Sequence, residues 1–148
     1  MNETNTHKLY ADFPRLYRLA IAGELMHYGI ECEDGWFNLI HKLSADIEAE
    51  AARLALDEEA WPAARQAKEK MGTLRFYCAA GTLDEEGRGM VPSIYSLIEQ
   101  AAEESSTICE ACGCPGTFRN SGAWLRTICD QCEALRQARH LEIVQGRA

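Results

Sequence analysis

The most regular pattern of apolar and polar positions runs through the segment "ECEDGWFNLIHKLSADIEAEAARLAL". Apolar residues recur there at the spacing of one helix face, and most acidic residues fall off that face. Asp34 stands just before the pattern and can cap a first turn. The segment predicts one long helix whose apolar face packs in the core. The residues on this face are Trp36, Ile40, Leu43, Ile47, Ala51 and Leu54.

Two shorter stripes predict further helices. Near the start of the chain, Pro14 suits a first helical turn, Asp12 can cap it and Gly29 offers a stop. The second stripe follows Pro92 and continues to about Ser105. The positions on the first stripe are Leu16, Leu19, Ala20, Gly23 and Met26, and those on the second are Ile94, Leu97, Ile98, Ala101 and Ala102.

The middle of the chain contains a strand pattern. In "TLRFYCA", Leu74, Phe76 and Cys78 alternate with polar positions, which predicts a strand with Cys78 on its apolar side. The preceding segment, 62–71, fits either a helix from Pro62 to Gly72 or the first arm of a hairpin. A loop rich in glycine and acids, "GTLDEEGRG", follows the strand. These elements predict an α+β fold with a mainly helical body and a small antiparallel sheet.

Five of the seven cysteines lie in one stretch, "ICEACGCPGTFRNSGAWLRTICDQC". Cys109 with Cys112 and Cys129 with Cys132 form two C-x-x-C pairs, and sixteen residues separate the pairs. This spacing is typical of a four-cysteine zinc site. Between the pairs, "TFRNSGAWLRT" predicts a hairpin that bends at "RNSG". The stretch therefore predicts a C-terminal zinc-ribbon-like module, followed by a short helix over "EALRQARHLEIV".

The ligand count predicts a structural rather than a catalytic metal. Four thiolates fill a tetrahedral Zn²⁺ and leave no position for water or substrate. Zinc deaminases carry an H-x-E element upstream of a C-x-x-C pair that follows a proline. Here the H-x-E element, His140 to Glu142, lies downstream, and neither pair follows a proline. A redox role for the pairs is the minor alternative. We therefore expect structural Zn²⁺ and no enzymatic activity.

Other cysteines and histidines give weaker signals. Cys114 is either a spare thiol or a replacement ligand for Cys112. Cys32 could join His27 or His41 in a second metal site, although an ordinary half-buried thiol fits its surroundings better.

Length and charge limit the function classes. The chain of 148 residues fits one domain with a small metal-bound appendage, and we divide it into a body, 1–106, and a ribbon module, 107–148. The net charge is −8, and the body holds 19 acidic and 10 basic residues. Such a body favours solubility or basic partners over nucleic-acid backbone. With no secretory pattern and no apolar run of membrane length, we expect a cytoplasmic protein without a membrane partner.

One basic segment interrupts the acidic body. Arg65, Lys68, Lys70 and Arg75 lie close together in the sequence, and they either bind an acidic partner or phosphate or pair with the body's own acids. Trp61 lies just before them in a polar stretch, and we expect it to be exposed as an interface anchor. Together these five residues form a weak candidate for partner binding.

Several segments together resemble a known group of proteins. The segments "DGWFNLI", "KEKMGTLRFY", "CEACGCPG" and "CDQC" resemble small uncharacterised proteins of phages, prophages and bacteria, over roughly 32–132. The chain departs from the group at Met71, where an aromatic residue is common, and at Cys114. The resemblance implies a metal-binding ribbon and a phage or mobile-element setting, and it implies no activity.

These observations lead to one functional expectation and its alternatives. We expect a non-enzymatic, zinc-stabilised interaction protein that binds another protein, such as a phage or mobile-element inhibitor of a host defence protein. The alternative is a zinc-ribbon nucleic-acid-binding regulator, whose affinity would fall steeply with salt. No small-molecule substrate is indicated, and an enzyme whose site is assembled by the fold stays open.

Overall fold

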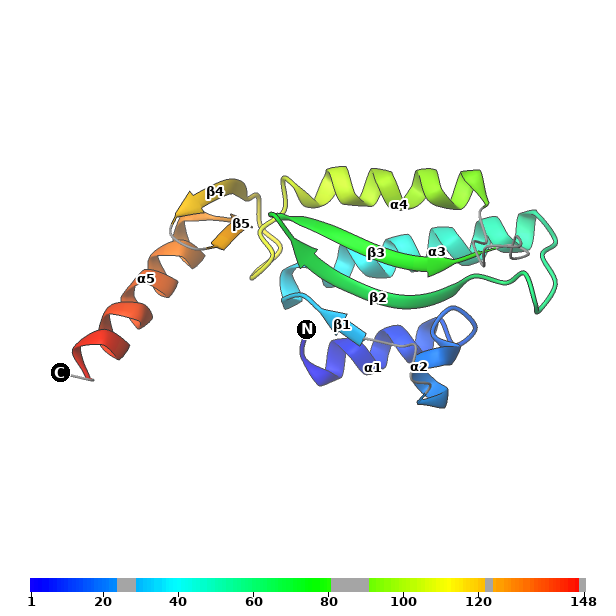
Figure 1. The fold of residues 1–148 in the computed structure, drawn as a ribbon, viewed down its shortest axis with the longest axis horizontal. Helices are drawn as coiled ribbons and strands as arrows, with labels where there is room; N and C mark the ends of the chain where they lie inside the picture. Colours follow the sequence, from blue (N-terminus) through cyan, green and yellow to red (C-terminus); the bar gives the residue numbers. More distant parts are fainter. Residues whose placement is uncertain (24–28, 81–90, 122–123, 147–148) are drawn as a thin grey trace.

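The computed structural model describes residues 1–23, 29–80, 91–121 and 124–146 (Figure 1). It confirms the predicted α+β class, with a mainly helical body, a small sheet and a ribbon-like hairpin near the C-terminus. The elements are, in chain order, α1 (Glu3–Asp12), α2 (Arg18–Ala22), β1 (Gly29–Glu31), the 3₁₀ turn η1 (Asp34–Trp36), α3 (Phe37–Arg53), β2 (Ala63–Lys70), β3 (Thr73–Ala79), α4 (Pro92–Ser105), β4 (Thr117–Ser121), β5 (Trp124–Ile128) and α5 (Asp130–Gln145).

A three-stranded sheet in the order β1-β2-β3 forms the centre of the body. β1 runs parallel to β2, and β2 pairs antiparallel with β3, so that Ala67 lies opposite Phe76 and Lys68 opposite Arg75. In Figure 1, α3 lies behind β2 and β3, and α4 runs along β3. The core includes Trp36, whose side chain is fully buried, as its position on the helical stripe predicted. None of the described helices combines the length and apolarity that a bilayer span requires.

The sequence predicts a first helix from Pro14 toward Gly29; among the described residues, the structure has there only α2, of five residues, and an unpredicted helix, α1, before it. The side chain of Asn2 caps α1, because it accepts a hydrogen bond from the backbone N–H of Asn5. Pro14 follows the end of α1 rather than beginning a helix, a common position for proline. Asp12 is not a cap, since its carboxylate pairs with Lys8. α2 ends at Gly23 with φ +69°, before the expected stop at Gly29; Met26 lies outside the described residues.

The predicted long helix forms, but it ends before Leu54, which is exposed, and Asp34 has a different role. α3 begins at Phe37, after η1, and no side-chain cap precedes it. The carboxylate of Asp34 instead accepts hydrogen bonds from the backbone N–H of Asn2 (2.8 Å) and the side-chain amide of Asn5 (3.0 Å). A residue with the chemistry of a helix cap therefore joins the start of α1 to the start of α3.

Residues 63–70 form a strand, so the hairpin alternative for 62–71 is the one observed. The composition favours a helix, but pairing with β1 on one side and β3 on the other outweighs that local preference. The turn between β2 and β3 consists of Met71 (φ +56°) and Gly72 (φ +79°). Positive φ at both positions is the geometry of the two-residue turns that match strand twist. The acidic loop predicted after β3 lies outside the described residues.

The C-terminal part contains the predicted hairpin and helix. β4 and β5 pair antiparallel from Thr117 opposite Ile128 to Ser121 opposite Trp124. The bend predicted at "RNSG" begins too early, because Arg119, Asn120 and Ser121 belong to β4 and pair with β5; Gly122 lies outside the described residues. α5 begins three residues earlier than predicted and extends away from the body (Figure 1).

Candidate metal centre

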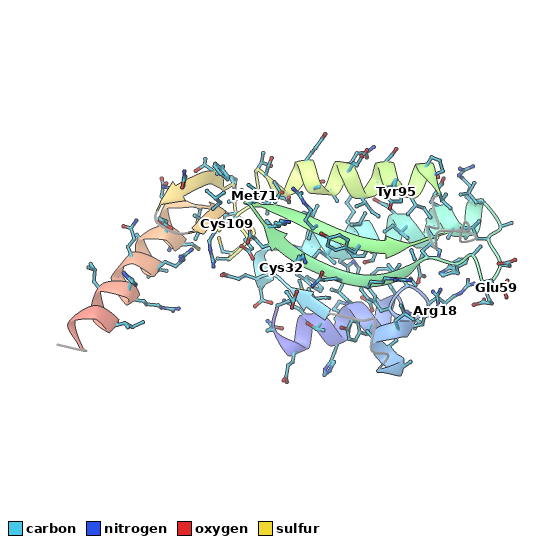
Figure 2. All side chains as sticks on the ribbon, viewed as in Figure 1. Arg18, Cys32, Glu59, Met71, Tyr95 and Cys109 are labelled. Carbon is cyan, nitrogen blue, oxygen red and sulfur yellow. The ribbon has the colours of Figure 1, made fainter. Side chains whose placement is uncertain are left out.

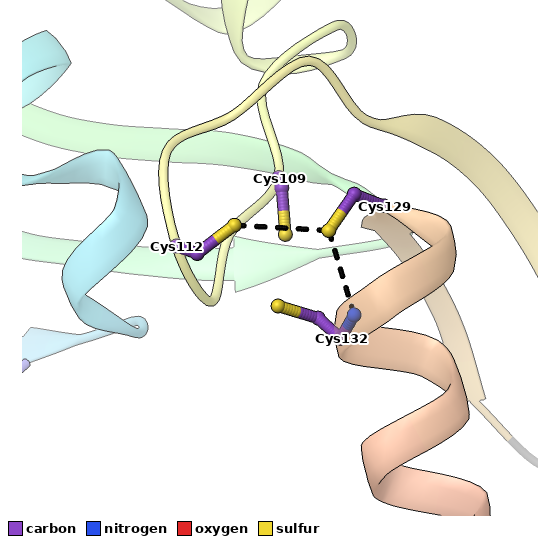
Figure 3. Close-up of side chains that lie close together, drawn as sticks. All are labelled: Cys109, Cys112, Cys129 and Cys132. Carbon is purple, nitrogen blue, oxygen red and sulfur yellow. Dashed lines mark hydrogen bonds between the residues drawn. The ribbon is translucent and has the colours of Figure 1, made fainter.

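The two C-x-x-C pairs come together between the end of α4 and the start of α5 (Figure 3). Cys109 and Cys112 lie in the loop that follows α4, Cys129 precedes α5 and Cys132 lies in its first turn. All four Sγ atoms lie within 4.8 Å of one another. The predicted ligands are therefore assembled in one cluster that could bind a metal ion.

The dimensions of the cluster fit a tetrahedral ion bound by sulfur. A Zn–S distance of about 2.3 Å gives a tetrahedron with edges of about 3.8 Å. The Sγ atoms of Cys112 and Cys129 are 3.7 Å apart, close to that edge. Four thiolates around Zn²⁺ would carry a net charge of −2, and the N-terminus of α5 supplies partial positive charge beside them.

Local hydrogen bonding favours the thiolate at Cys129. The backbone N–H of Cys132 donates to Cys129 Sγ at 3.5 Å and lowers the pKa of Cys129 to about 7. Burial raises the pKa of the Cys109 and Cys132 thiols. Burial thus opposes ionisation at Cys109 and Cys132, whereas the hydrogen bond to Cys129 Sγ favours it there.

Glycines shape the loop that carries the first pair. Gly113 has φ +78°, and its N–H donates to the carbonyl of Cys109 at 2.8 Å, which closes the turn between the paired cysteines. A Cβ at Gly116 would lie 2.7 Å from the backbone nitrogen of Cys109. The loop can therefore pass this close only with glycine at that position.

The same loop packs directly on the body. Gly35 in η1 donates its N–H to the carbonyl of Glu110 at 2.7 Å, and an added Cβ there would lie 2.2 Å from the carbonyl oxygen of Cys109. Next to it, Trp36 Nε1 donates to the carbonyl of Ile108 at 2.9 Å. Sequence reasoning missed Gly35; the available signal was a glycine directly before the tryptophan that begins the long apolar stripe.

A second contact joins the ribbon to the turn between β2 and β3. Thr127 Oγ1 donates to the carbonyl of Gly72 at 2.6 Å, and a Cβ at Gly72 would lie 2.7 Å from the ring of Phe118. Glu110 connects the two contacts, because its backbone N–H donates to the carbonyl of Thr127 at 3.0 Å. The loop that carries Cys109 and Cys112, which we call the metal-binding loop, is thus held from both sides.

An ion pair and a buried carboxyl complete this contact region. Arg126 Nη1 lies 2.8 Å from Glu33 Oε1. Glu110 is buried, and one of its carboxyl oxygens accepts the backbone N–H of Glu33 at 3.1 Å. Burial raises the pKa of Glu110. These contacts add polar interactions to the glycine-mediated packing.

The expectation that Trp61 is exposed is wrong. Its side chain is only 6% exposed, and the guanidinium carbon of Arg15 lies 3.2 Å from the centre of its ring. Arg18 donates hydrogen bonds to the carbonyls of Trp61 and Pro62, which hold this segment against the start of α2. An arginine 46 positions earlier in the chain therefore covers a side chain that the polar stretch around it suggested would reach solvent.

The four basic candidates lie on β2 and β3. Arg65 is the extra residue of a β-bulge and is half-buried, with no hydrogen-bond partner at Nε among the described residues. The ammonium of Lys68 lies 5.2 Å from the centre of the Tyr77 ring, and Lys70 is exposed. Arg75 donates to Thr73 Oγ1 at 2.8 Å and to the carbonyl of Leu74 at 3.3 Å.

Cys114 lies apart from the cluster. It is exposed and lines a surface pocket of about 330 Å³ whose other residues are Pro115, Thr117, Cys129, Asp130 and Gln131. Cys32 is buried, and its pKa is raised to about 12 by burial. Across the described ranges, the four-cysteine cluster is the only group of His, Cys, Asp and Glu side chains that could hold a metal ion; His27 lies outside them.

Comparison with known proteins found no match. Neither a protein-family model, nor a curated protein, nor a solved structure matches the chain. We therefore infer the function from the geometry of the site and from the surface around it.

Proposed function

We propose that this protein is a zinc-stabilised interaction protein, in which a structural Zn²⁺ holds the ribbon module against the body and no catalysis takes place at the metal. The observation that carries the proposal is the closed set of four Sγ atoms within 4.8 Å. Four thiolates satisfy a tetrahedral Zn²⁺ and leave it no open position.

The contacts of the metal-binding loop support a structural role. The loop is in contact with Gly35 and, through Thr127, with Gly72, so an ion that fixes the loop also fixes two segments of the body. Binding of Zn²⁺ to such sites supplies about 10 kcal/mol of folding free energy. The metal then stabilises a surface shared by the two parts of the chain rather than the ribbon alone.

The partner we favour is another protein. Two of the ribbon's arginines already form ion pairs, Arg119 with Asp130 and Arg126 with Glu33, which leaves less positive charge for a nucleic-acid backbone. The net charge of −8 also opposes a polyanionic ligand. The resemblance to phage and prophage proteins supports the narrower proposal of a phage or mobile-element inhibitor of a host protein.

Metal analysis of purified protein tests the metal part of this proposal. We expect one equivalent of zinc in the wild-type chain, retention in Cys114→Ser and loss in Cys129→Ser. Full zinc content in Cys129→Ser would contradict the assigned ligand set. Affinity purification from host lysate tests the interaction part: a stoichiometric protein partner is expected, and its absence, with zinc present, would count against an interaction role.

A further inference from the structure

One face of the central sheet carries no described helix. Leu74 and Phe76 on β3, with Ala67 on β2, point into the core. Side chains alternate along a strand, so their neighbours point to the opposite face. In Figure 1, α3 lies behind β2 and β3, and no described helix crosses in front of them. We call this surface the open sheet face, and its residues are Gln66, Lys68, Lys70, Thr73, Arg75 and Tyr77.

The open sheet face carries basic side chains that form no ion pair with the described acids. Among the described basic residues of 1–106, four form ion pairs with carboxylates: Lys8, Arg15, Lys42 and Arg53. Arg18 donates instead to three backbone carbonyls. The remaining cations, which form no ion pair with a described residue, all lie on β2 or β3: Arg65, Lys68, Lys70 and Arg75. In a body with 19 acidic residues, this concentration of unpaired cations on one sheet is unexpected for a surface without a partner.

The nearest acids accept hydrogen bonds from uncharged donors and form no ion pair with these cations. Glu31 lies opposite Lys68 in the β1–β2 pairing, but it accepts a hydrogen bond from Gln66 Nε2 at 2.5 Å. Glu69 lies on the core side of β2 and accepts the backbone N–H of Gly72 at 2.6 Å. Lys68, Lys70 and Arg75 are therefore available to carboxylates from another molecule.

The spacing of these cations matches an extended peptide. Lys68 and Lys70 are two residues apart on β2, a separation of roughly 6.6 Å along a strand. Arg75 lies directly opposite Lys68 on β3. Carboxylates at every second residue of an extended chain have the same period. An acidic strand laid along β2 could thus bring successive carboxylates to successive cations.

Exposed apolar side chains lie beside this charge. Tyr77 is 44% exposed, and its ring lies under the ammonium of Lys68. At the turn, Met71 is 61% exposed, and Figure 2 shows it where the sheet meets the ribbon. Phe118, which packs on Gly72, is 54% exposed. A partner that pairs with the cations can therefore also cover apolar surface at the turn.

We propose that the open sheet face binds an extended, acidic segment of a partner protein, with carboxylates contacting Lys68, Lys70 and Arg75 and apolar residues contacting Met71 and Phe118. This inference rests on the proposed function, because the Zn²⁺-bound ribbon supplies Phe118. A single-stranded nucleic acid fits less well. A nucleic acid carries a negative charge at every nucleotide, so the nucleotides beyond the three cations would be repelled by the net negative charge of the body. A peptide can carry its negative charges at those three positions alone.

The test measures binding of defined probes to the zinc-loaded full chain by fluorescence anisotropy. The probe is a short labelled peptide in which glutamate alternates with threonine; the same peptide with glutamine and an oligothymidylate of equal charge serve as comparisons. The test variant is Lys68→Gln/Lys70→Gln/Arg75→Gln. The matched control is Lys8→Gln/Lys42→Gln/Arg53→Gln, which removes the same charge from ion-paired helical positions. Zinc content and the unfolding midpoint are measured for each variant.

We expect the glutamate peptide alone to bind, and the sheet-face variant to bind it about tenfold or more weakly while the control binds normally. Absence of peptide binding to zinc-loaded wild type would overturn the inference while leaving the proposed structural metal intact. Equal weakening in both variants would show that only net charge matters, and this result would also overturn the inference. Tighter binding of oligothymidylate than of the glutamate peptide would overturn the inference and indicate nucleic acid as the ligand of this face. A chain that folds without zinc would instead contradict the proposed function.

Discussion

Gly35 and Cys109 meet so closely that a Cβ on Gly35 would lie 2.2 Å from the carbonyl oxygen of Cys109. The contact joins η1, at the start of the longest helix of the body, to the first candidate metal ligand. It is a backbone contact on both sides, so neither side can yield by turning a side chain. The metal centre and the body should therefore respond together to a change at either residue.

Gly35→Ala is expected to destabilise the whole chain by about 2 kcal/mol, because the added methyl forces backbone atoms of η1 and the metal-binding loop apart. Urea unfolding followed by tryptophan fluorescence measures this, and zinc affinity should fall in parallel. Gly23→Ala is the control: its site has open space, so only the strain of φ +69° remains, about 1 kcal/mol. Wild-type stability of Gly35→Ala would show that the close contact is absent in solution.

Ser105 is expected to stabilise the edge of β3 through a buried hydrogen bond. Its Oγ accepts the backbone N–H of Leu74 at 2.8 Å while donating to the carbonyl of Ala102 at 2.6 Å. Ser105→Ala leaves that buried N–H unsatisfied and should cost about 1–3 kcal/mol in urea unfolding. Ser106→Ala removes a similar local bond at an exposed position, to Glu103, and should change stability little. If both substitutions changed stability equally, the hydrogen bond from the Leu74 N–H to Ser105 would not be the cause.

Strong local patterns predicted the bounds of some elements closely. β3 spans the segment whose alternation marked a strand, and α4 begins at Pro92 and ends at Ser105 as its stripe indicated. Both predictions depended on signals within the segment itself: a period of two, or proline in the first turn of an apolar stripe. The cysteine spacing was equally local, and it identified the four side chains that the fold gathers.

Predictions that depended on distant partners were less successful. Residues 63–70 contain helix-favouring side chains, yet two neighbouring strands hold them extended. Trp61 lies in a stretch rich in charged residues, yet Arg15 covers its ring. The Gly35 contact was missed, because the glycine before Trp36 signals a constrained position but does not indicate which distant segment packs against it. In each case the deciding interaction joins segments that are far apart in the chain.

Acid should weaken the protein partly through Glu50. Two hydrogen bonds from Arg53, both 2.7 Å, and one from Ser93 lower the pKa of Glu50 from 4.5 to about 2. Between these values the unfolded chain binds more protons than the folded one, so stability falls as pH falls. Glu50→Gln should be less stable than wild type near pH 7, and the difference should disappear toward pH 2. Urea unfolding across this range measures the difference.

Acid also protonates the cysteine ligands, but it does so in wild type and variant alike, so the difference between them isolates Glu50. Glu59→Gln serves as the control, since Glu59 is exposed and has no ion pair with a described residue. A difference between wild type and Glu50→Gln that stayed constant from pH 7 to pH 2 would contradict the assigned cause.

The thiols should separate into three classes by their rate of alkylation with iodoacetamide, read by mass spectrometry. Cys114 is exposed and outside the cluster, so it should react first in the zinc-loaded protein. Cys112 is also exposed, but ligation should protect it until a chelator removes the metal. Cys32 and Cys78, whose pKa values burial raises to about 12, should stay slow until the chain unfolds.

The order within the exposed pair is the decisive result. Exposure alone predicts that Cys112 and Cys114 react at similar rates with or without chelator, whereas ligation predicts that only Cys112 changes. Protection of Cys114 together with fast reaction of Cys112 would exchange their roles and give a cluster of Cys109, Cys114, Cys129 and Cys132. The two-residue turn shared by both C-x-x-C pairs, with Gly113 closing the first, is the physical reason to expect Cys112 as the ligand.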